Sequence, residues 1–460
     1  MTSVHALPRS SSPSNSTRRR LLSLTGSAIL GSLAGCVDRV PLFSDRDTES
    51  KPTTGNPQTD LEPRPETETG TPEPELALHT EYNSRERFGS PGDSFDDFED
   101  LSSWQAVEGK LSVDTETYVT GSQSMRVTGP ADEKAVFDRH LETPLNLAEN
   151  DLSFEFRSEN PGKVAVLVYA YDADDNWAVL ELRSVTYRPP DVGWFRTCPG
   201  VFKTSETDPD LSQVERLHVE VINTADTDTN SWLDDMRVVP KADTGYVVLS
   251  WDDGFTNFYE QGAPLHDEYD VPAVHAYPPY AEESPGVSFM TEAQIRERQE
   301  AGDEIVSHAT IQKRFSEISP DRLAEKLERN KQWLVDREFE GADFIVYPAN
   351  DFDRAALDTI SEYHYMGGMN QSGSTNTTSV YGFDPLVLPR TIGHDLDISK
   401  RAVDMAAAHN QCAILNFHHF KKRHTMPVAD YEKLLQHITE KQGIEVITFS
   451  DLWELRKTGP

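Results

Sequence analysis

The sequence predicts an antiparallel β-sandwich followed by a domain in which strands and helices alternate. Residues 90–243 hold short runs of alternating apolar and polar residues, separated by Gly, Asn, Asp and Pro, and this spacing is typical of a sandwich. From residue 244 onward, apolar runs of strand length alternate with segments of helical period, as in β/α folds. We therefore place a domain boundary between residues 243 and 244.

The sandwich strands are expected where apolar residues recur with a period of two. Such runs lie at 110–113, 124–128, 152–156 and 164–170. The segments 98–104 and 231–239 resemble the jelly-roll carbohydrate-binding modules, and this resemblance implies a domain that binds glycan.

Two questions stay open for the sandwich. The acidic clusters at 172–175 and 225–229 could hold calcium or form solvated turns. Four tryptophans could stack on sugar rings or lie in the core; they are Trp104, Trp177, Trp194 and Trp232.

The second domain is expected to open on a strand at 246–251, whose continuous apolar run suits a parallel strand covered on both faces. Thr291 and Gln294 form a capping-box pattern that opens a helix ending near Gly302. Other helices are expected at 320–334, 354–362, 400–409 and 429–441, and other strands at 304–307, 343–347, 412–417 and 444–449.

Three of these strands end in side chains that can bind a metal or move a proton. Asp252 and Asp253 follow the first strand, His308 follows a later one, and His418 follows the run that begins at Cys412. Because β/α folds gather the carboxyl ends of their strands on one face, we expect these side chains to converge.

Residues 244–455 resemble the polysaccharide deacetylases, the NodB-homology domain of carbohydrate esterase family 4. The family's first motif, Thr-Phe-Asp-Asp-Gly, resembles Ser-Trp-Asp-Asp-Gly at 250–254. The second, His-Thr-x-x-His, corresponds to His-Ala-Thr-Ile-Gln at 308–312, and the third, Arg-x-Pro-Tyr, keeps only its proline at 346–349. The closing Leu-x-His motif resembles Asn-Phe-His at 416–418. The resemblance implies a distorted (β/α) barrel that removes acetyl groups from a polysaccharide.

The resemblance also implies a role for each matching residue. Asp253, His308 and Gln312 would hold a divalent metal, and zinc is the common one in the family. Asp252 would act as general base on the attacking water, and His418 would protonate the departing amine. Two adjacent carboxylates suit these roles, because the metal neutralises one and leaves the other ionised.

Departures from the family motifs leave alternatives open. Gln312 is a weaker ligand than histidine, so it could bind the metal weakly, His275 could replace it, or the metal could be absent. Arg390 could replace the missing third-motif arginine as partner of the catalytic aspartate, or could be a surface residue at a strand end. The backbone N–H at Ala349 keeps the family's oxyanion contact, whereas an aromatic wall is lost there.

The first 36 residues predict an exported lipoprotein. Thr-Arg-Arg-Arg-Leu-Leu at 17–22 precedes an apolar stretch that is too short to span a bilayer. This pattern is a twin-arginine signal, and Leu-Ala-Gly-Cys at 33–36 resembles the lipoprotein cleavage box, with Cys36 as the lipid-bearing residue. The alternative is a soluble secreted protein. Residues 37–89 are polar and are expected to form a disordered tether, because the stretch is rich in Thr, Pro and Glu.

The chain is strongly acidic, with 43 Lys and Arg against 78 Asp and Glu and a formal net charge of −35. This charge argues against nucleic acid as a partner. In a chain with two patterned domains, it favours a surface adapted to very high salt, where self-repulsion is screened. Apart from Cys36, only Cys198 and Cys412 remain, and we expect free thiols rather than a disulfide.

We therefore expect an enzyme that is lipid-anchored on the outer face of the cell membrane, or extracellular. It would remove N-acetyl groups, or less readily O-acetyl groups, from a cell-surface or external polysaccharide. One alternative is a barrel that has lost catalysis and only binds glycan, and another is metal-dependent hydrolysis of a non-sugar amide. Of the enzyme and the glycan-binding protein, only the enzyme predicts a metal at Asp253 and His308 and release of acetate.

Overall fold

The computed structural model describes residues 76–459 with gaps at 184, 186–190, 225, 281–287, 310–313, 369, 373–374 and 421–424. The described residues all belong to one compact unit, Arg39–Pro460. The predicted export signal, Cys36, Gln312 and the tether up to residue 75 lie outside the described residues.

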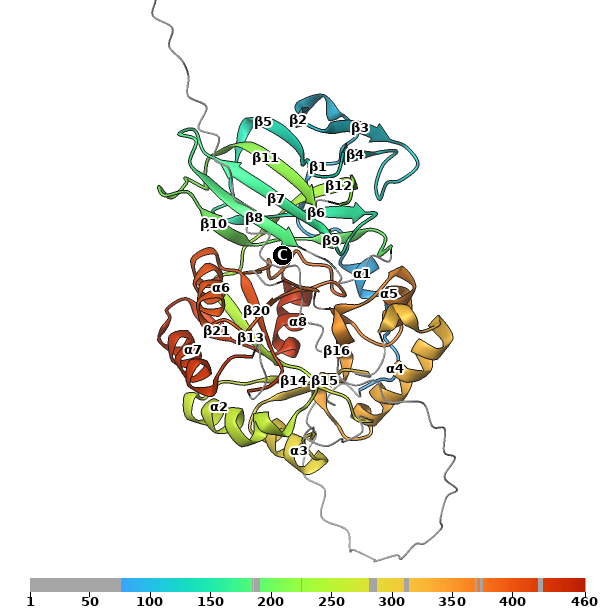
Figure 1. Ribbon diagram of the computed structural model, residues 1–460, viewed down its shortest axis with the longest axis vertical. Coiled ribbons are helices and arrows are strands. Elements are labelled where there is room, and N and C mark those ends of the chain that lie inside the picture. The colour runs from blue at the N-terminus through green and yellow to red at the C-terminus, as the bar shows by residue number, and fades with distance from the viewer. Residues whose placement is uncertain are drawn as a thin grey trace, which may run out of the picture. The chain divides into compact units, whose positions relative to one another are not determined.

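Two antiparallel sheets form the first half of the described chain (Figure 1). One has the order β3-β4-β12-β6-β9, with β1 also paired to β12; its strands are β1 (Asp93–Asp96), β3 (Lys110–Asp114), β4 (Ser124–Gly129), β6 (Asn150–Ser158), β9 (Phe195–Thr197) and β12 (Thr229–Pro240). The other has the order β10-β8-β7-β11-β5-β2; its strands are β2 (Trp104–Glu108), β5 (Ala135–Leu145), β7 (Val164–Tyr171), β8 (Trp177–Arg183), β10 (Val201–Thr204) and β11 (Val214–Asn223). The predicted β-sandwich is confirmed.

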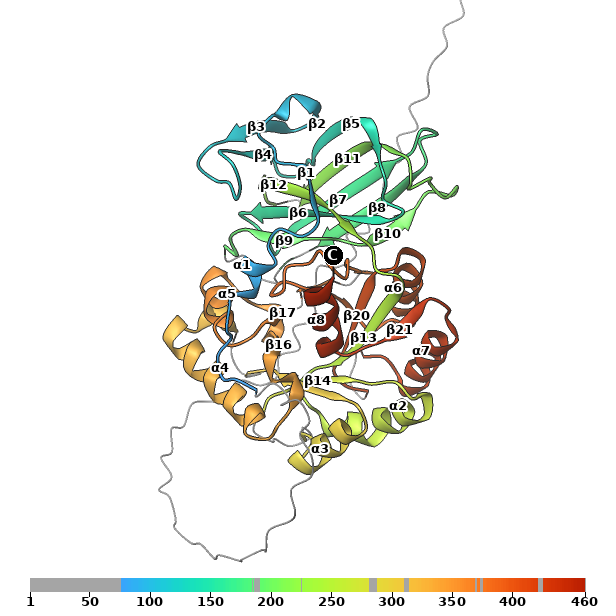
Figure 2. The same cartoon turned by 180° about the vertical axis from the view of Figure 1, so that it is seen from behind.

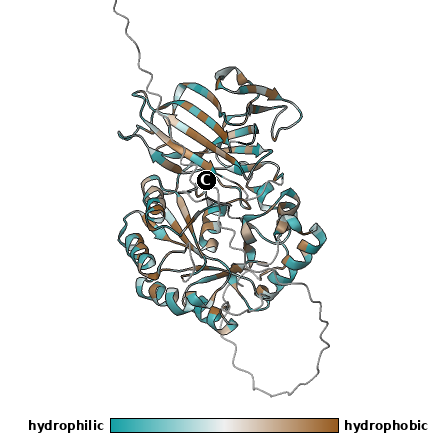
Figure 3. Ribbon diagram, in the orientation of Figure 1, coloured by the Kyte–Doolittle hydropathy of each residue, from teal (hydrophilic) through white to brown (hydrophobic). Residues whose placement is uncertain are grey.

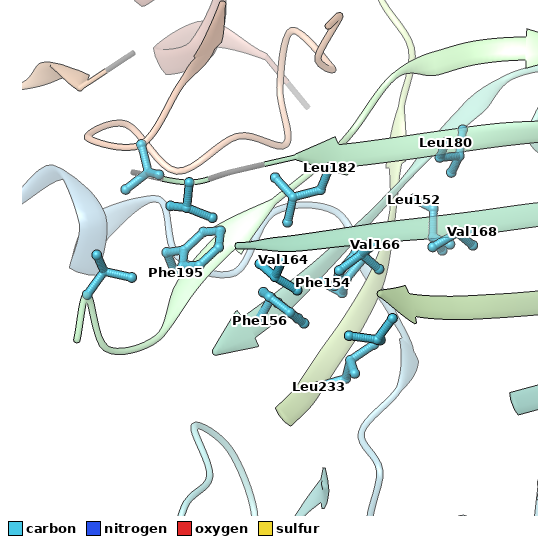
Figure 4. Packing of buried hydrophobic residues seen from close by; sticks show 14 of the residues in the cluster. Leu152, Phe154, Phe156, Val164, Val166, Val168, Leu180, Leu182, Phe195 and Leu233 are labelled. Atoms are coloured by element: carbon cyan, nitrogen blue, oxygen red, sulfur yellow. The ribbon is translucent and has the colours of Figure 1, made fainter. Parts of the chain in front are cut away.

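The inner faces of the sandwich are lined by buried apolar residues that alternate with residues of the outer face, as the period of a strand requires. Figure 3 shows this alternation as bands of colour along the strands. On β7 the buried positions are Val164, Val166, Val168 and Ala170. They pack against phenylalanines of β6 and β9 and leucines of β8 (Figure 4).

Two of the four tryptophans proposed for sugar stacking lie in buried positions instead. Trp104 is buried and donates its indole N–H to Asp96, while Trp232 is buried and donates to Asp114. Trp177 and Trp194 are half-buried. The core alternative therefore holds for Trp104, whereas Trp232 lies on the opposite face of β12 from the core residue Leu233 and is covered by the guanidinium groups of Arg126 and Arg157.

The acidic cluster at 172–175 forms a hydrogen-bonded turn. The Asp172 carboxylate accepts the backbone N–H groups of Asp174, Asn176 and Asp210. In the cluster at 225–229, Asp226 accepts hydrogen bonds from Thr224 and from Lys163. These carboxylates are engaged by protein donors, which favours the turn alternative over a calcium site.

A nine-stranded parallel sheet forms the second half and curls into a nearly closed barrel (Figures 1 and 2). Its order is β17-β16-β15-β14-β13-β20-β19-β18, and β21 also pairs with β13. The strands are β13 (Gly245–Trp251), β14 (Val274–Tyr277), β15 (Glu304–Ser307), β16 (Phe344–Val346), β17 (Met366–Gly368), β18 (Asn370–Ser372), β19 (Pro389–Ile392), β20 (Cys412–Phe417) and β21 (Ile444–Val446). Every residue of β13 is buried, as its apolar run predicted, and the distorted (β/α) barrel is confirmed.

Six helices of the described chain cover the outside of the barrel, namely α2 (Ala263–Tyr269), α3 (Glu292–Glu300), α4 (Pro320–Val335), α5 (Arg354–Ile360), α6 (Leu396–His409) and α7 (Val428–Glu440). The last described helix, α8 (Phe449–Thr458), lies within the ring of strands instead (Figures 1 and 2). The capping box of Thr291 and Gln294 is present at the start of α3. The strand predicted at 444–449 ends earlier than expected, because Thr448 and Asp451 form a second capping box that starts α8 at Phe449.

Residues 76–89 correct the predicted extent of the tether, because they are ordered against the barrel. They include α1 (Ser84–Arg87), which is capped by the Asn83 side chain. The backbone N–H of Thr80 donates to Glu362, and Tyr82 and Phe88 pack against the buried cluster that includes Trp453. Arg85 adds an ion pair with the buried Asp384, and the polar composition of the segment gave no sign of these contacts.

The sandwich contacts the barrel at the amino-terminal ends of the barrel strands. β12 ends at Pro240 and β13 begins at Gly245. Gln411, just before β20, is fully buried, donates to Asp151 and accepts the N–H of Val201. The sandwich also reaches the segment after β16, where the backbone N–H of Arg354 donates to the Asp191 carbonyl.

Within the described ranges, no helix has the length and apolar character needed to cross a membrane. Cys198 and Cys412 are buried free thiols, as predicted.

Candidate functional site

The predicted site residues gather where three barrel strands end. Asp252 follows β13, His308 follows β15 and His418 follows β20, while Arg390 lies within β19. β19, β20 and β13 are neighbours in the sheet. The parallel topology therefore brings groups from distant parts of the chain to one end of the barrel.

The turn after β13 sets the directions of the two aspartates. The backbone N–H of Asp252 still donates to Phe417 of β20, at 2.9 Å. Asp253 and Gly254 then adopt left-handed conformations, with φ of 69° and 64°. A Cβ at Gly254 would lie 2.6 Å from the Tyr277 ring, so only glycine fits this tight turn. The two carboxylates consequently meet different partners.

Asp252 is bound by Arg390. The guanidinium Nη1 donates to both carboxylate oxygens, at 2.9 and 3.0 Å. The two side chains are 1% and 3% exposed. The alternative of a surface arginine is therefore wrong, because Arg390 is among the largest fully buried side chains of the described chain. The two hydrogen bonds fix the orientation of the Asp252 carboxylate.

His418 lies on the solvent side of Asp252. Its Nε2 is 3.7 Å from Asp252 Oδ2, and its side chain is about a third exposed. The His394 ring stands near it, with 6.3 Å between ring centroids. This position lets His418 reach a bound substrate while it stays close to a carboxylate.

Asp253 and His308 face each other. His308 Nε2 lies 3.2 Å from Asp253 Oδ1, and Nδ1 lies 2.9 Å from the Val346 carbonyl oxygen. Burial opposes the charged imidazolium, but the carboxylates of Asp253 and Asp252 outweigh it and raise the pKa of His308.

This pair fits a metal ion. When Nδ1–H donates to the Val346 carbonyl, the neutral ring presents the Nε2 lone pair toward Asp253, which is the usual second contact of a metal-binding histidine. The Nε2 lone pair of His308 and the carboxylate oxygen of Asp253, both hydrogen-bond acceptors, would then face each other. A cation bound between them would remove their repulsion. Imidazole and carboxylate are common zinc ligands.

The described residues supply only part of a complete ligand set. Within them, no group of three His, Cys, Asp or Glu side chains is placed to hold a metal. The predicted third ligand, Gln312, lies outside the described residues. Its role stays a prediction.

His275 is engaged elsewhere. Its Nε2 lies 2.8 Å from Asp303 Oδ2, and Arg298 donates to the same carboxylate. The ring packs edge-on against Phe258, with 4.4 Å between centroids. These contacts favour a structural role for His275 over replacement of Gln312.

Ala349 lies beyond the end of β16, at the same end of the barrel as the other site residues. It is exposed and left-handed, with φ of 57°. Tyr347, two residues earlier, is buried and donates its hydroxyl to the Leu386 carbonyl. It therefore does not replace the missing aromatic wall.

An aromatic cluster that sequence reasoning missed lies beside the site. Phe255 stacks on Phe289 with 5.7 Å between centroids, and the His419 ring meets Phe255 edge-on at 5.4 Å. Phe255 directly follows the Asp-Asp-Gly turn and His419 directly follows His418, so their positions in the sequence could have indicated that they lie beside the site. Nothing in the sequence indicated that the distant Phe289 joins them.

The outer face of the second sandwich sheet carries another aromatic cluster. Tyr169 of β7 lies 5.3 Å from Trp177 of β8 and 5.7 Å from His218 of β11, between ring centroids. Tyr171 stacks near Tyr169 at 6.2 Å and is covered by the Arg216 guanidinium. The four rings are half-buried, so part of each faces outward.

Comparison with protein families identifies one match. Residues 240–368 match the family model described as polysaccharide deacetylase. The resemblance predicted from the motifs is therefore confirmed for this part of the chain. The matched range includes Asp252, Asp253 and His308 but ends before Arg390 and His418. No curated protein matches the chain.

Several solved structures are similar to parts of the chain. The CE4 domain of a multidomain xylanase from the hindgut metagenome of Trinervitermes trinervoides is 15% identical, covers 47% of this chain and 94% of its own, and has a TM-score of 0.34. A family 4 acetyl xylan esterase from Clostridium thermocellum, in complex with a cobalt ion, is 16% identical, with coverages of 47% and 93% and a TM-score of 0.32. A family 11 carbohydrate-binding module from Clostridium thermocellum, in complex with a mixed-linked tetrasaccharide, is 16% identical, with coverages of 32% and 95% and a TM-score of 0.25.

Proposed function

We propose that the polysaccharide deacetylase domain of this chain is an active, metal-dependent hydrolase that removes N-acetyl groups from a polysaccharide. The observation that carries the proposal is the buried pair of Arg390 and Asp252, with His418 next to it. A carboxylate and an imidazole within 4 Å of each other are the acid–base groups that amide hydrolysis needs.

Each residue has a distinct part in this reaction. Arg390 fixes the orientation of Asp252, so that the carboxylate can take a proton from the attacking water. His418, which is more exposed, gives a proton to the leaving nitrogen, because an amine anion cannot leave near neutral pH. The backbone N–H of Ala349, an exposed residue, would donate to the developing oxyanion.

Asp253 and His308 would hold the metal, with Gln312 as the proposed third ligand. A divalent ion bound there, which we propose to be zinc, would polarise the acetyl carbonyl and would lower the pKa of a water molecule bound to it. His308 is already oriented for this task by the Val346 carbonyl. The adjacent Asp252 stays available as a base because Arg390, rather than the metal, is its partner.

The substrate is proposed to be a polymer that the sandwich also binds. The outer face with Tyr169, Tyr171, Trp177 and His218 offers exposed ring edges and faces, which suit contact with the C–H groups of sugars. O-acetyl groups stay a second possible target, since ester hydrolysis needs the same acid–base groups.

We also propose that the protein works at the cell surface. The twin-arginine pattern and the Leu-Ala-Gly-Cys box at 33–36 support export and lipid attachment at Cys36. The net charge of −35 supports a setting of very high salt.

The test is the metal content of the purified chain in high salt, measured by mass spectrometry with acetate release from N-acetylated polysaccharides. We expect about one equivalent of a divalent ion. Asp253→Ala combined with His308→Ala should lose both the metal and the activity. An absence of metal after reconstitution, with glycan binding retained, would instead support the alternative of a barrel that only binds glycan.

A further inference from the structure

We infer that a second ligand site lies where segment 76–89, the sandwich and α5 meet, and that it takes a small amine-bearing sugar. A cavity of about 250 Å³ lies there. Its wall includes Arg85 and Phe88 of the segment and Glu155, Trp194 and Arg196 of the sandwich. The inference rests on the proposed function for its ligand, because hydrolysis of an N-acetyl sugar yields acetate and an amino sugar.

The two arginines in the wall already have carboxylate partners. Arg85 donates through Nε to both oxygens of Asp384, at 3.1 and 2.9 Å. Arg196 donates through Nη2 to Asp235 at 2.5 Å and through Nε to the Gly89 carbonyl at 2.5 Å. Each guanidinium already binds an aspartate, although Arg196 shares Asp235 with Arg237, so neither attracts an anion into the cavity.

Glu155 is the buried carboxylate in the wall to which no described residue donates a hydrogen bond. Its side chain is 10% exposed, and its nearest cation is Arg196 Nε at 3.3 Å. That N–H is directed at the Gly89 carbonyl, and no described residue donates a hydrogen bond to the Glu155 carboxylate. Burial accordingly raises the pKa of Glu155 to about 7, against the opposing effect of Arg196. A buried carboxylate needs donors, and here the contents of the cavity must supply them.

The charges of the wall favour a cation as the donor. Asp384 is paired with Arg85, and Asp235 is paired with both Arg196 and Arg237, so Glu155 is the one of these three carboxylates that accepts no hydrogen bond from an arginine. A primary ammonium group would meet this carboxylate and offer three hydrogen-bond donors.

The size and the apolar part of the wall favour a single sugar ring. Pockets for drug-sized ligands measure about 300–1,000 Å³, so a cavity of about 250 Å³ suits a smaller molecule. Phe88 and Trp194 supply aromatic surface for the C–H face of a ring. An amino monosaccharide, or the amino sugar at the end of a chain, combines these features.

Calorimetric titration of the full chain in high salt tests the site. Glucosamine is compared with glucose and N-acetylglucosamine, which share the ring but lack the ammonium group. We expect glucosamine to bind at least about tenfold more tightly than either, which is about 1.4 kcal/mol. Glu155→Gln should abolish this preference, whereas Glu86→Gln, an exposed carboxylate at the rim, should retain it. Glu155→Asp, which withdraws the carboxylate by one methylene, serves as a second variant and should weaken the preference.

Equal affinities for the three sugars, or a preference that survives Glu155→Gln, would overturn the inference. Binding that is instead lost in the Asp253→Ala, His308→Ala variant would assign the amine to the catalytic end of the barrel, and would also overturn it. A chain without acetate release whose glucosamine binding depends on Glu155 would refute the proposed function and leave this site standing.

Discussion

Replacing Arg390 with alanine should destabilise the protein strongly, because the partner of Arg390 is a buried carboxylate. Nη1 donates to both oxygens of Asp252, at 2.9 and 3.0 Å, and the two side chains are 1% and 3% exposed. Removal of one partner leaves the other charge buried without compensation, which costs about 3–5 kcal/mol. We expect Arg390→Ala to lower the free energy of unfolding by this amount.

A double-mutant cycle isolates the pair from the packing of the arginine side chain. In an Asp252→Asn background no charge is stranded, so Arg390→Ala should cost less there by about 1.5–3 kcal/mol. Urea unfolding at constant high salt, followed by tryptophan fluorescence, measures each variant. Arg157→Ala is the matched control, since its partner Asp191 is 57% exposed and such pairs contribute at most about 1 kcal/mol.

An equal loss in both backgrounds would refute this reasoning. It would mean that Arg390 stabilises the barrel by packing alone, and that its guanidinium does not hold the Asp252 carboxylate. The proposal that Arg390 orients the general base would then be refuted as well.

Three further predictions concern the site and the barrel. Asp252→Asn should lower acetate release by about 10²–10⁴-fold while the metal content stays normal, and an unchanged rate would remove Asp252 from the reaction. Gln312→His should tighten zinc binding, measured with a competing chelator, because imidazole is the better ligand; no gain would place residue 312 away from the metal. Burial raises the pKa of Glu304 from 4.5 to about 7, above its value in the unfolded chain. The contribution of Glu304 to stability is therefore present below pH 4.5 and lost as the pH rises to about 7. Across this range the free energy of unfolding, measured in urea, should fall less in Glu304→Gln than in the wild type.

The convergence of Asp252, His308 and His418 could be predicted because each directly ends an apolar strand. Parallel strands leave little freedom at that point, since their carboxyl ends share one face. The partnership of Arg390 with Asp252 could be offered only as one of two alternatives. Its outcome depended on which way a long side chain points, and the strand pattern does not determine that.

Other features lay beyond the reach of sequence patterns. The docking of residues 76–89 depends on Tyr82 and Phe88 meeting a cluster that includes Trp453, across more than three hundred residues of chain. The orientation of His308 depends on a backbone carbonyl of β16. Every residue carries such a carbonyl, so the sequence does not show which one the histidine contacts. Phe289 likewise meets Phe255 through an isolated bridge between two loops.

The presence of a buried pair of Arg390 and Asp252 is better explained by a role in catalysis than by a contribution to the stability of the fold. β19 is separated from β13 by β20, so the guanidinium reaches across about 10 Å of sheet, and burying two charges costs desolvation that their attraction barely offsets. Replacing both by apolar residues of similar volume is often neutral or stabilising. We therefore expect Arg390→Met with Asp252→Leu to unfold in urea within about 1 kcal/mol of the wild type and to release no acetate. A much larger loss of stability would show that the pair holds the barrel together, and retained activity would show that the base lies elsewhere.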